Sequence, residues 1–122
     1  MYLPVHAWLL AFLLTVALEI PLVARLLRGC DPGGWRLVVL VVFANLATHP
    51  AVWFILPQLF YVSTLPFLAA SELWAVAAEA VFYAVAFRGV TPARALATSV
   101  IANAASFIVG LVVTELWPQL FF

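Results

Sequence analysis

Apolar residues dominate the chain in four long runs, which polar and turn-forming residues separate. The runs cover approximately residues 3–27, 35–56, 66–87 and 92–117. Each run is close to the ~20 residues that an α-helix needs to cross the hydrocarbon core of a bilayer. The pattern therefore predicts an all-α integral membrane protein with four transmembrane helices, folded as a single domain over residues 1–122.

The composition excludes water as the solvent of this fold. Hydrophobic residues make up 68% of the chain and charged residues only 8%, too few to cover a soluble domain. The basic residues are five arginines, and the formal net charge is zero. We therefore expect the lipid bilayer as a partner and no nucleic acid. The single Cys30 excludes an intramolecular disulfide.

The arginines predict the orientation of the helices. Arg25, Arg28 and Arg36 flank the first connector, and Arg88 and Arg94 flank the third, whereas the middle connector and both tails carry none. Cytoplasmic loops are enriched in basic residues. We therefore expect the 28–36 and 88–94 connectors to be cytoplasmic, both termini to lie outside, and the membrane to be the inner or plasma membrane of the cell.

The rarest polar residues recur at a fixed spacing, which indicates an internal repeat. A shift of sixty residues pairs Glu19 with Glu79, Arg28 with Arg88, Gly29 with Gly89 and Pro32 with Pro92. With a two-residue deletion in the second copy, it also pairs Arg36 with Arg94, Asn45 with Asn103, and Thr48 with Ser106. The pattern predicts two tandem parallel helical-hairpin repeats, about 3–56 and 66–117, related by a pseudo-twofold axis along the membrane normal.

The repeat also predicts a polar layer at one depth. Glu19 precedes Arg28 by nine residues, Asn45 follows Arg36 by nine, and the second copy has the same offsets. Nine residues of α-helix rise about 13–14 Å. Measured from the cytoplasmic arginines, the two Glu and two Asn therefore lie near the middle of a ~30 Å hydrocarbon core.

Two interpretations of this layer remain open. Carboxylates facing lipid are costly, so both Glu should point inward toward the Asn amides, and two adjacent carboxyls would not both ionise readily. The layer could bind a proton, a cation or a small polar substrate. Alternatively, it could only join the helices by hydrogen bonds, although Gln would do that without the problem of ionisation.

The predicted substrate- or ion-binding residues are the four of this layer and three that extend it outward. The layer consists of Glu19, Asn45, Glu79 and Asn103, and the outward residues are Thr48, His49 and Ser106. Glu72 lies two turns outward of Glu79 on the same helix face and marks a possible access path from outside. His49 precedes Pro50, which would free a backbone carbonyl beside the imidazole. With Glu19 and Glu79, His49 could form a metal site or a proton relay, or it could be a single hydrogen-bonded buried histidine.

The leading hypothesis is a small transporter or permeation protein without a cofactor, either a homo-oligomer or part of a membrane complex. A non-catalytic membrane subunit or assembly factor is the alternative, and an intramembrane metal-dependent or acid-base enzyme is third, since no enzyme motif is present. In length, helix number and the Glu in its first span, the chain resembles small four-helix multidrug exporters. Those exporters generally carry one essential Glu, whereas here a Glu–Asn pattern is duplicated, so the likeness assigns no family.

Overall fold

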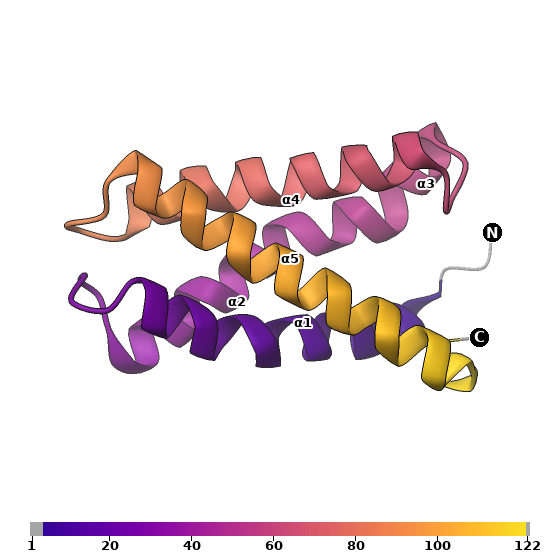
Figure 1. The fold of residues 1–122 in the computed structure, drawn as a ribbon, viewed down its shortest axis with the longest axis horizontal. Coiled ribbons are helices and arrows are strands. Elements are labelled where there is room, and N and C mark those ends of the chain that lie inside the picture. Colours follow the sequence, from indigo (N-terminus) through magenta and orange to yellow (C-terminus); the bar gives the residue numbers. More distant parts are fainter. Residues whose placement is uncertain (1–3, 122) are drawn as a thin grey trace.

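The computed structural model describes residues 4–121, and in this part of the chain the regular elements are all helices. The long helices are α1 (Val5–Leu26), α2 (Gly34–Pro50), α4 (Leu65–Ala86) and α5 (Pro92–Leu116) (Figure 1). The π-helix η1 (Ala51–Ile55) and α3 (Leu56–Leu59) extend α2, and η2 (Pro118–Leu120) follows α5. Four helices are thus long and apolar enough to cross a membrane, which confirms the predicted number of spans. The predicted start at Leu3 lies outside the described residues.

The second span changes its helical form at Pro50. Proline has no N–H to donate to the carbonyl of Leu46, so the regular α-helical bonding is interrupted there. The chain continues as the wider π-helix η1 and then as α3, and the span ends at Leu59. Its end therefore lies three residues beyond the end that the sequence pattern predicted.

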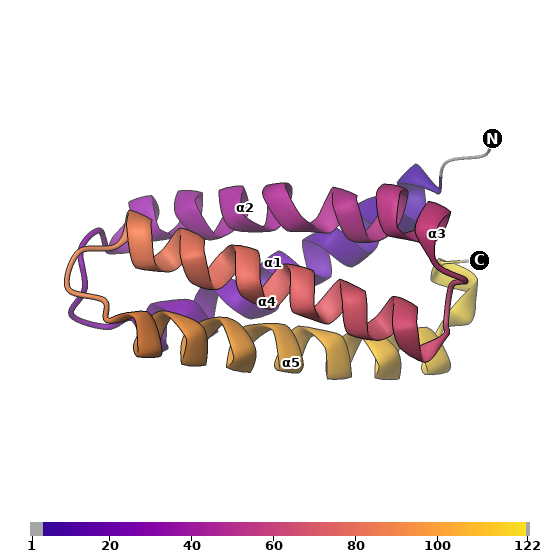
Figure 2. The same ribbon diagram turned by 90° about the horizontal axis from the view of Figure 1, so that it is seen from above.

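The four spans form a closed ring of packed neighbours. Helix α1 packs on α2 and α5, and α4 packs on α5 and α2, so that α1 and α4 lie diagonally across the bundle. Figures 1 and 2 show the N- and C-termini at one end, with the α1–α2 and α4–α5 connectors at the other. We call these the terminal end and the connector end. In Figure 1, α2 slants toward α4 and α5 slants toward α1 on the way to the terminal end, where η1 and α3 contact α4.

The two hairpin connectors are joined to each other by backbone hydrogen bonds. Gly29 and Gly89 adopt positive φ angles of 85° and 80°, which reverse the chain after a helix at little cost for glycine. Asp31 N–H then donates to the carbonyl of Arg88 at 3.2 Å, and Arg88 N–H donates to the carbonyl of Asp31 at 2.6 Å. The connector end of the bundle is therefore held together between the hairpins.

Arg94 reinforces this junction. Its Nε donates to the carbonyl of Leu26 at 3.0 Å, and its Nη2 donates to the carbonyl of Arg28 at 2.9 Å. These carbonyls belong to the C-terminal end of α1 and its connector, where main-chain acceptors lack helical partners. A cation is also favourable at a helix C-terminus. Arg94 therefore caps α1 from α5.

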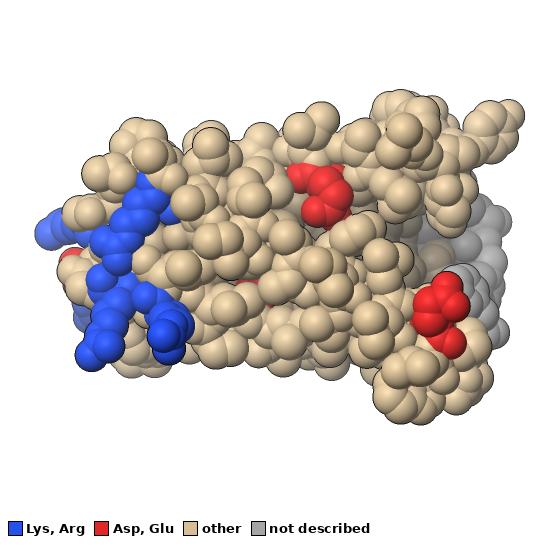
Figure 3. Space-filling view, in the orientation of Figure 1, with Lys and Arg blue, Asp and Glu red and all other residues tan. Residues whose placement is uncertain are grey.

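The apolar core fills the half of the bundle nearest the connectors. Its buried members are Val23, Leu27, Leu37, Val41, Ala44, Tyr83, Phe87, Ala95 and Ala102. The outer surface is also apolar, since Phe43, Val85 and Ile108 remain 59%, 83% and 60% exposed. Side chains of this size on every helix form an outer surface suited to lipid. Figure 3 shows the basic side chains gathered at the connector end of the bundle.

Candidate functional site

Two glutamate side chains lie inside the bundle, just beyond the apolar core. Glu19 of α1 is 0% exposed and Glu79 of α4 is 1% exposed. Because α1 and α4 are diagonal helices, each carboxyl group enters the centre of the ring from an opposite side. Both Glu therefore point away from lipid, as the cost of a lipid-facing carboxylate requires.

The carboxyl group of Glu19 has a hydrogen-bond donor at each oxygen. Asn45 Nδ2 of α2 donates to Oε2 at 2.8 Å. Ser106 Oγ of α5 contacts Oε1 at 3.0 Å. Glu19 is thus linked to both helices that pack against α1.

Glu79 has the same arrangement with the other two polar residues. Asn103 Nδ2 of α5 donates to Oε2 at 2.7 Å, and Thr48 Oγ1 of α2 contacts Oε1 at 3.0 Å. In both cases the amide comes from the partner helix in the same hairpin, and the hydroxyl comes from the other hairpin. We refer to these six residues, Glu19, Asn45, Thr48, Glu79, Asn103 and Ser106, as the polar network.

The two amides can only donate to the carboxyl groups. Besides its bond to Glu19, Asn45 Nδ2 donates to the carbonyl of Val41 at 3.1 Å. Asn103 Nδ2 likewise donates to the carbonyl of Ser99 at 3.0 Å. A main-chain carbonyl accepts and never donates, so the amide nitrogen must occupy this position. The orientation of both amides is therefore fixed by the backbone.

The two hydroxyls, in contrast, have a choice of acceptor. Thr48 Oγ1 lies 3.2 Å from the carbonyl of Ala44, and Ser106 Oγ lies 3.1 Å from the carbonyl of Asn103. A hydroxyl has one proton and two lone pairs. It can donate to an ionised carboxylate, or it can accept from a protonated carboxyl while donating to its own backbone. The network therefore keeps its contacts in both protonation states of each Glu.

A cavity of about 1120 Å³ leads from the terminal end to the polar network. Pro4, Pro57 and Gln119 line it at the terminal end, and Glu79 and Ser106 lie at its inner end. Asn45, Thr48 and Asn103 also border it, whereas Glu19 is not among its lining residues. The cavity therefore approaches the two carboxyl groups unequally.

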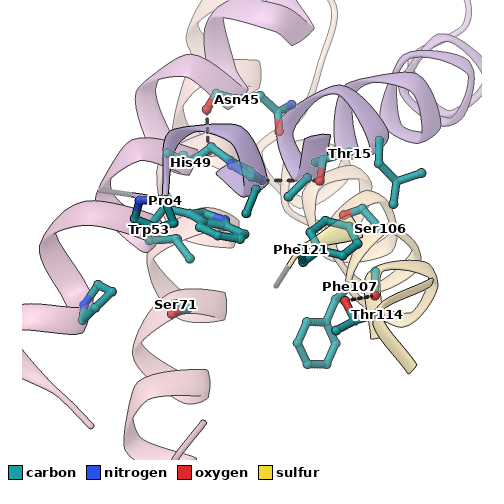
Figure 4. A pocket seen from close by; sticks show the side chains of 18 of the residues that line it. Pro4, Thr15, Asn45, His49, Trp53, Ser71, Ser106, Phe107, Thr114 and Phe121 are labelled. Atoms are coloured by element: carbon teal, nitrogen blue, oxygen red, sulfur yellow. Dashed lines mark hydrogen bonds between the residues drawn. The ribbon is translucent and has the colours of Figure 1, made fainter. Parts of the chain in front are cut away.

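His49 lies on the wall of this cavity and away from both buried carboxyl groups. Its Nε2 is 3.4 Å from Thr15 Oγ1, and its ring packs parallel to Trp53 (Figure 4). The ring also packs edge-on to Phe12. The hydrogen bonds of His49 do not include Glu19 or Glu79. Among residues 4–121, no group of three or more His, Cys, Asp or Glu side chains is arranged to hold a metal ion. His49 is half-buried, and its polar side-chain contact within the described part of the chain is the one to Thr15.

Two further polar atoms on the cavity wall have no hydrogen-bond partner among the described residues. They are Ser71 Oγ and His49 Nδ1. Buried polar atoms are nearly always paired, so both lack a partner that such atoms usually have. Tyr83 Oη, on the connector side of Glu79, is likewise buried and unpaired.

The structure brings six of the seven predicted site residues into one network, and it places His49 and Glu72 along the cavity. The sequence predicted the Glu–Asn pairs but assigned Thr48 and Ser106 only to an outward extension of the layer. Instead, each hydroxyl contacts the carboxyl group of the opposite hairpin. Sequence reasoning missed Thr15 and Ser71, although their positions four residues before Glu19 and eight before Glu79 lie near those helix faces.

Comparison of the chain with protein-family models, with curated proteins and with solved structures found no match. The functional argument therefore depends on the geometry of the site itself.

Proposed function

We propose that the chain is a small membrane transport or permeation protein whose polar network binds a proton, a cation or a small polar substrate partway across the membrane. One observation carries the proposal, namely that a cavity leads from the terminal end to a pair of buried carboxyl groups. Ionisable residues inside a transmembrane bundle commonly mark ion and substrate pathways. Ser71 and His49 add unpaired polar atoms along the same path.

The path is one-sided. Beyond the polar network, the apolar core and the joined connectors close the bundle toward the connector end. Transport through this protein would therefore require a second conformation, in which the connector end opens and the cavity closes. The two hairpins are the natural moving units of such a rearrangement.

The repeat and the orientation predicted from the sequence form part of the proposal. Two features support the repeat. First, five buried residues of α2 have buried counterparts 58 positions later in α5, and they are Leu37, Val41, Ala44, Asn45 and Thr48. Second, each Glu contacts an amide from its own hairpin and a hydroxyl from the other. We infer two hairpins related by a pseudo-twofold axis along the membrane normal. In this orientation, the arginine-rich connector end faces the cytoplasm and the cavity faces outside.

Association with a further protein chain also belongs to the proposal. Ala93, Ala97 and Ala104 of α5 are exposed on the outside of the bundle, and small residues allow helices to approach closely in a membrane. We propose a homo-oligomer or a complex with another membrane protein.

The rival function is a non-catalytic subunit or assembly factor, and one observation favours it. Each carboxyl oxygen in the network already has a contact with a donor from another helix. A fully paired network of this kind can fix the register of the helices without binding anything. The two functions differ in whether the carboxyl groups take part in transport.

A flux measurement in liposomes distinguishes them. Purified protein is reconstituted, and the pH-dependent flux of protons and monovalent cations is compared with that of the double variant Glu19→Gln/Glu79→Gln at equal insertion. Glu115→Gln is the matched control, because Glu115 is exposed near the end of α5. Flux that is lost in the double variant and retained in the control supports transport. Equal flux from all three, or none from any, would favour the structural subunit.

A further inference from the structure

The two carboxyl groups of the polar network differ in their access to the cavity. Glu79 is one of the residues that line it, whereas Glu19 is fully buried and does not. Two side chains that border the cavity, Asn45 and Ser106, also bond to Glu19 and so connect it to the cavity. Either side chain is therefore a candidate to pass a proton from the cavity to Glu19.

Asn45 cannot carry that proton. Its amide nitrogen donates both to Glu19 and to the carbonyl of Val41, so both N–H groups are committed. An amide nitrogen also lacks a lone pair that readily accepts a proton. The carboxyl oxygen that faces Asn45 therefore remains a hydrogen-bond acceptor.

Ser106 has the properties that a relay needs. The residue is 8% exposed and borders the cavity, and its hydroxyl lies 3.0 Å from Oε1 of Glu19. Ser106 Oγ also lies 3.1 Å from the carbonyl oxygen of Asn103, to which the hydroxyl can donate once Glu19 is protonated. Ser106 can therefore accept a proton on one side and release one on the other.

We infer that Ser106 is the proton-relay residue between the cavity and Glu19, while Glu79 exchanges its proton with the cavity directly. The inference rests on the proposed function and assigns unequal roles to the two Glu. In the step, a hydronium ion in the cavity gives a proton to Ser106 Oγ as the original hydroxyl proton moves to Glu19. The hydronium becomes water, the carboxylate becomes a carboxylic acid, and Ser106 is regenerated.

Other titratable groups lie along the cavity or beside the polar network and act on the charge of Glu19. Glu72 and Glu79 of α4 and His49 of α2 line the cavity, and Tyr83 lies one turn beyond Glu79 on α4. They can alter how readily Glu19 holds a proton. The relay instead concerns the rate at which the proton arrives, and this difference allows a kinetic test.

The test is a rapid pH jump followed by time-resolved infrared absorption of the protonated carboxyl band, on protein in lipid nanodiscs. Glu79→Gln leaves Glu19 as the buried reporter, and Glu19→Gln leaves Glu79. In the Glu79→Gln background, Ser106→Ala should slow protonation roughly 100-fold, the scale of a positioned proton-transfer group. In the Glu19→Gln background, the same change should leave the rate nearly unaltered.

Rescue separates a relay from a merely structural role. Ser106→Thr keeps a hydroxyl, as Thr48 does at the matching position beside Glu79, and should restore the rate. If Ser106→Ala fails to insert, Ser106→Cys replaces it, and its weakly bonding thiol should also slow protonation.

Unchanged kinetics of Glu19 after loss of the hydroxyl, or a Glu19 band that never responds to pH, would overturn the inference. Neither result bears on proton exchange at Glu79 or on the flux measurement, so the proposed function is tested separately.

Discussion

Because the orientation of the amides is fixed, two substitutions that preserve side-chain shape, Glu19→Gln and Asn45→Asp, should differ in their effect on stability. Glu19→Gln can be accommodated, because the new carbonyl oxygen can face Asn45 and the new amide nitrogen can face Ser106. The serine hydroxyl then donates to the carbonyl of Asn103, which lies within reach at 3.1 Å. All contacts are kept, so the free energy of unfolding should change by less than about 0.5 kcal/mol, as for a benign substitution.

Asn45→Asp has no such solution near neutral pH. The amide nitrogen of Asn45 faces two acceptors, Glu19 Oε2 at 2.8 Å and the carbonyl of Val41 at 3.1 Å, and an ionised carboxyl donates to neither. A hydrogen bond to a charged group contributes about 1.5–3 kcal/mol and one between neutral groups about 0.5–1.5. Side-chain hydrogen bonds measured inside membranes average nearer 0.6 kcal/mol. The loss should therefore be between about 1 and 4 kcal/mol.

Equilibrium unfolding in mixed lipid–detergent micelles, followed by circular dichroism, measures both variants against wild type. The deficit of Asn45→Asp should shrink on acidification, because protons bound to the introduced carboxyl and to Glu19 would restore both contacts. Equal stability of the two variants across pH would refute the argument that the backbone fixes the amide.

Three further predictions use the same unfolding measurement. Arg94→Ala should lower the free energy of unfolding by about 1–3 kcal/mol, because two hydrogen bonds to carbonyls at the end of α1 are lost. The control Arg36→Ala, at an exposed position, should change it by less than about 0.5 kcal/mol. Equal effects of the two substitutions would contradict the role of Arg94 as a cap. Tyr83→Phe should be neutral or stabilising by up to about 1–3 kcal/mol, because its buried hydroxyl has no partner among the described residues, and a clear loss would reveal a partner. Gly29→Ala should lower the free energy of unfolding by about 1–2 kcal/mol, because Gly29 has a φ of 85°. Gly33→Ala, at a φ of −110°, should lower it little. Equal stability of the two variants would contradict a left-handed turn at Gly29.

The sequence predicted the spans and their number because the physical signal is long and redundant. Each apolar run needs only length and composition to identify it. The end of the second span, where η1 and α3 follow α2, could not be predicted in this way. Pro50 indicates an interruption of the helix but does not determine how the chain continues. Whether a helix tightens, breaks or widens after a proline depends on its neighbours.

The Glu–Asn pairs could be predicted because their depth follows from helical rise alone. The hydroxyl contacts across the hairpins could not, since they depend on the rotation of each helix and on which helices adjoin. Thr48 and Ser106 lie one turn from Asn45 and Asn103, so the sequence placed them near the layer without identifying Glu79 and Glu19 as their partners. His49 was considered a possible partner of the glutamates, but its ring packs between Phe12 and Trp53 on the cavity wall.

The central claim is that the buried carboxyl pair exchanges protons with water through the cavity. Its most direct test is an equilibrium infrared titration of the protein in bilayers, in which the protonated carboxyl band is followed over the pH range where circular dichroism shows the fold intact. We predict a reversible band that is present in wild type and absent from Glu19→Gln/Glu79→Gln. A carboxyl band that is identical in the two proteins, or one that never changes with pH, would contradict the claim.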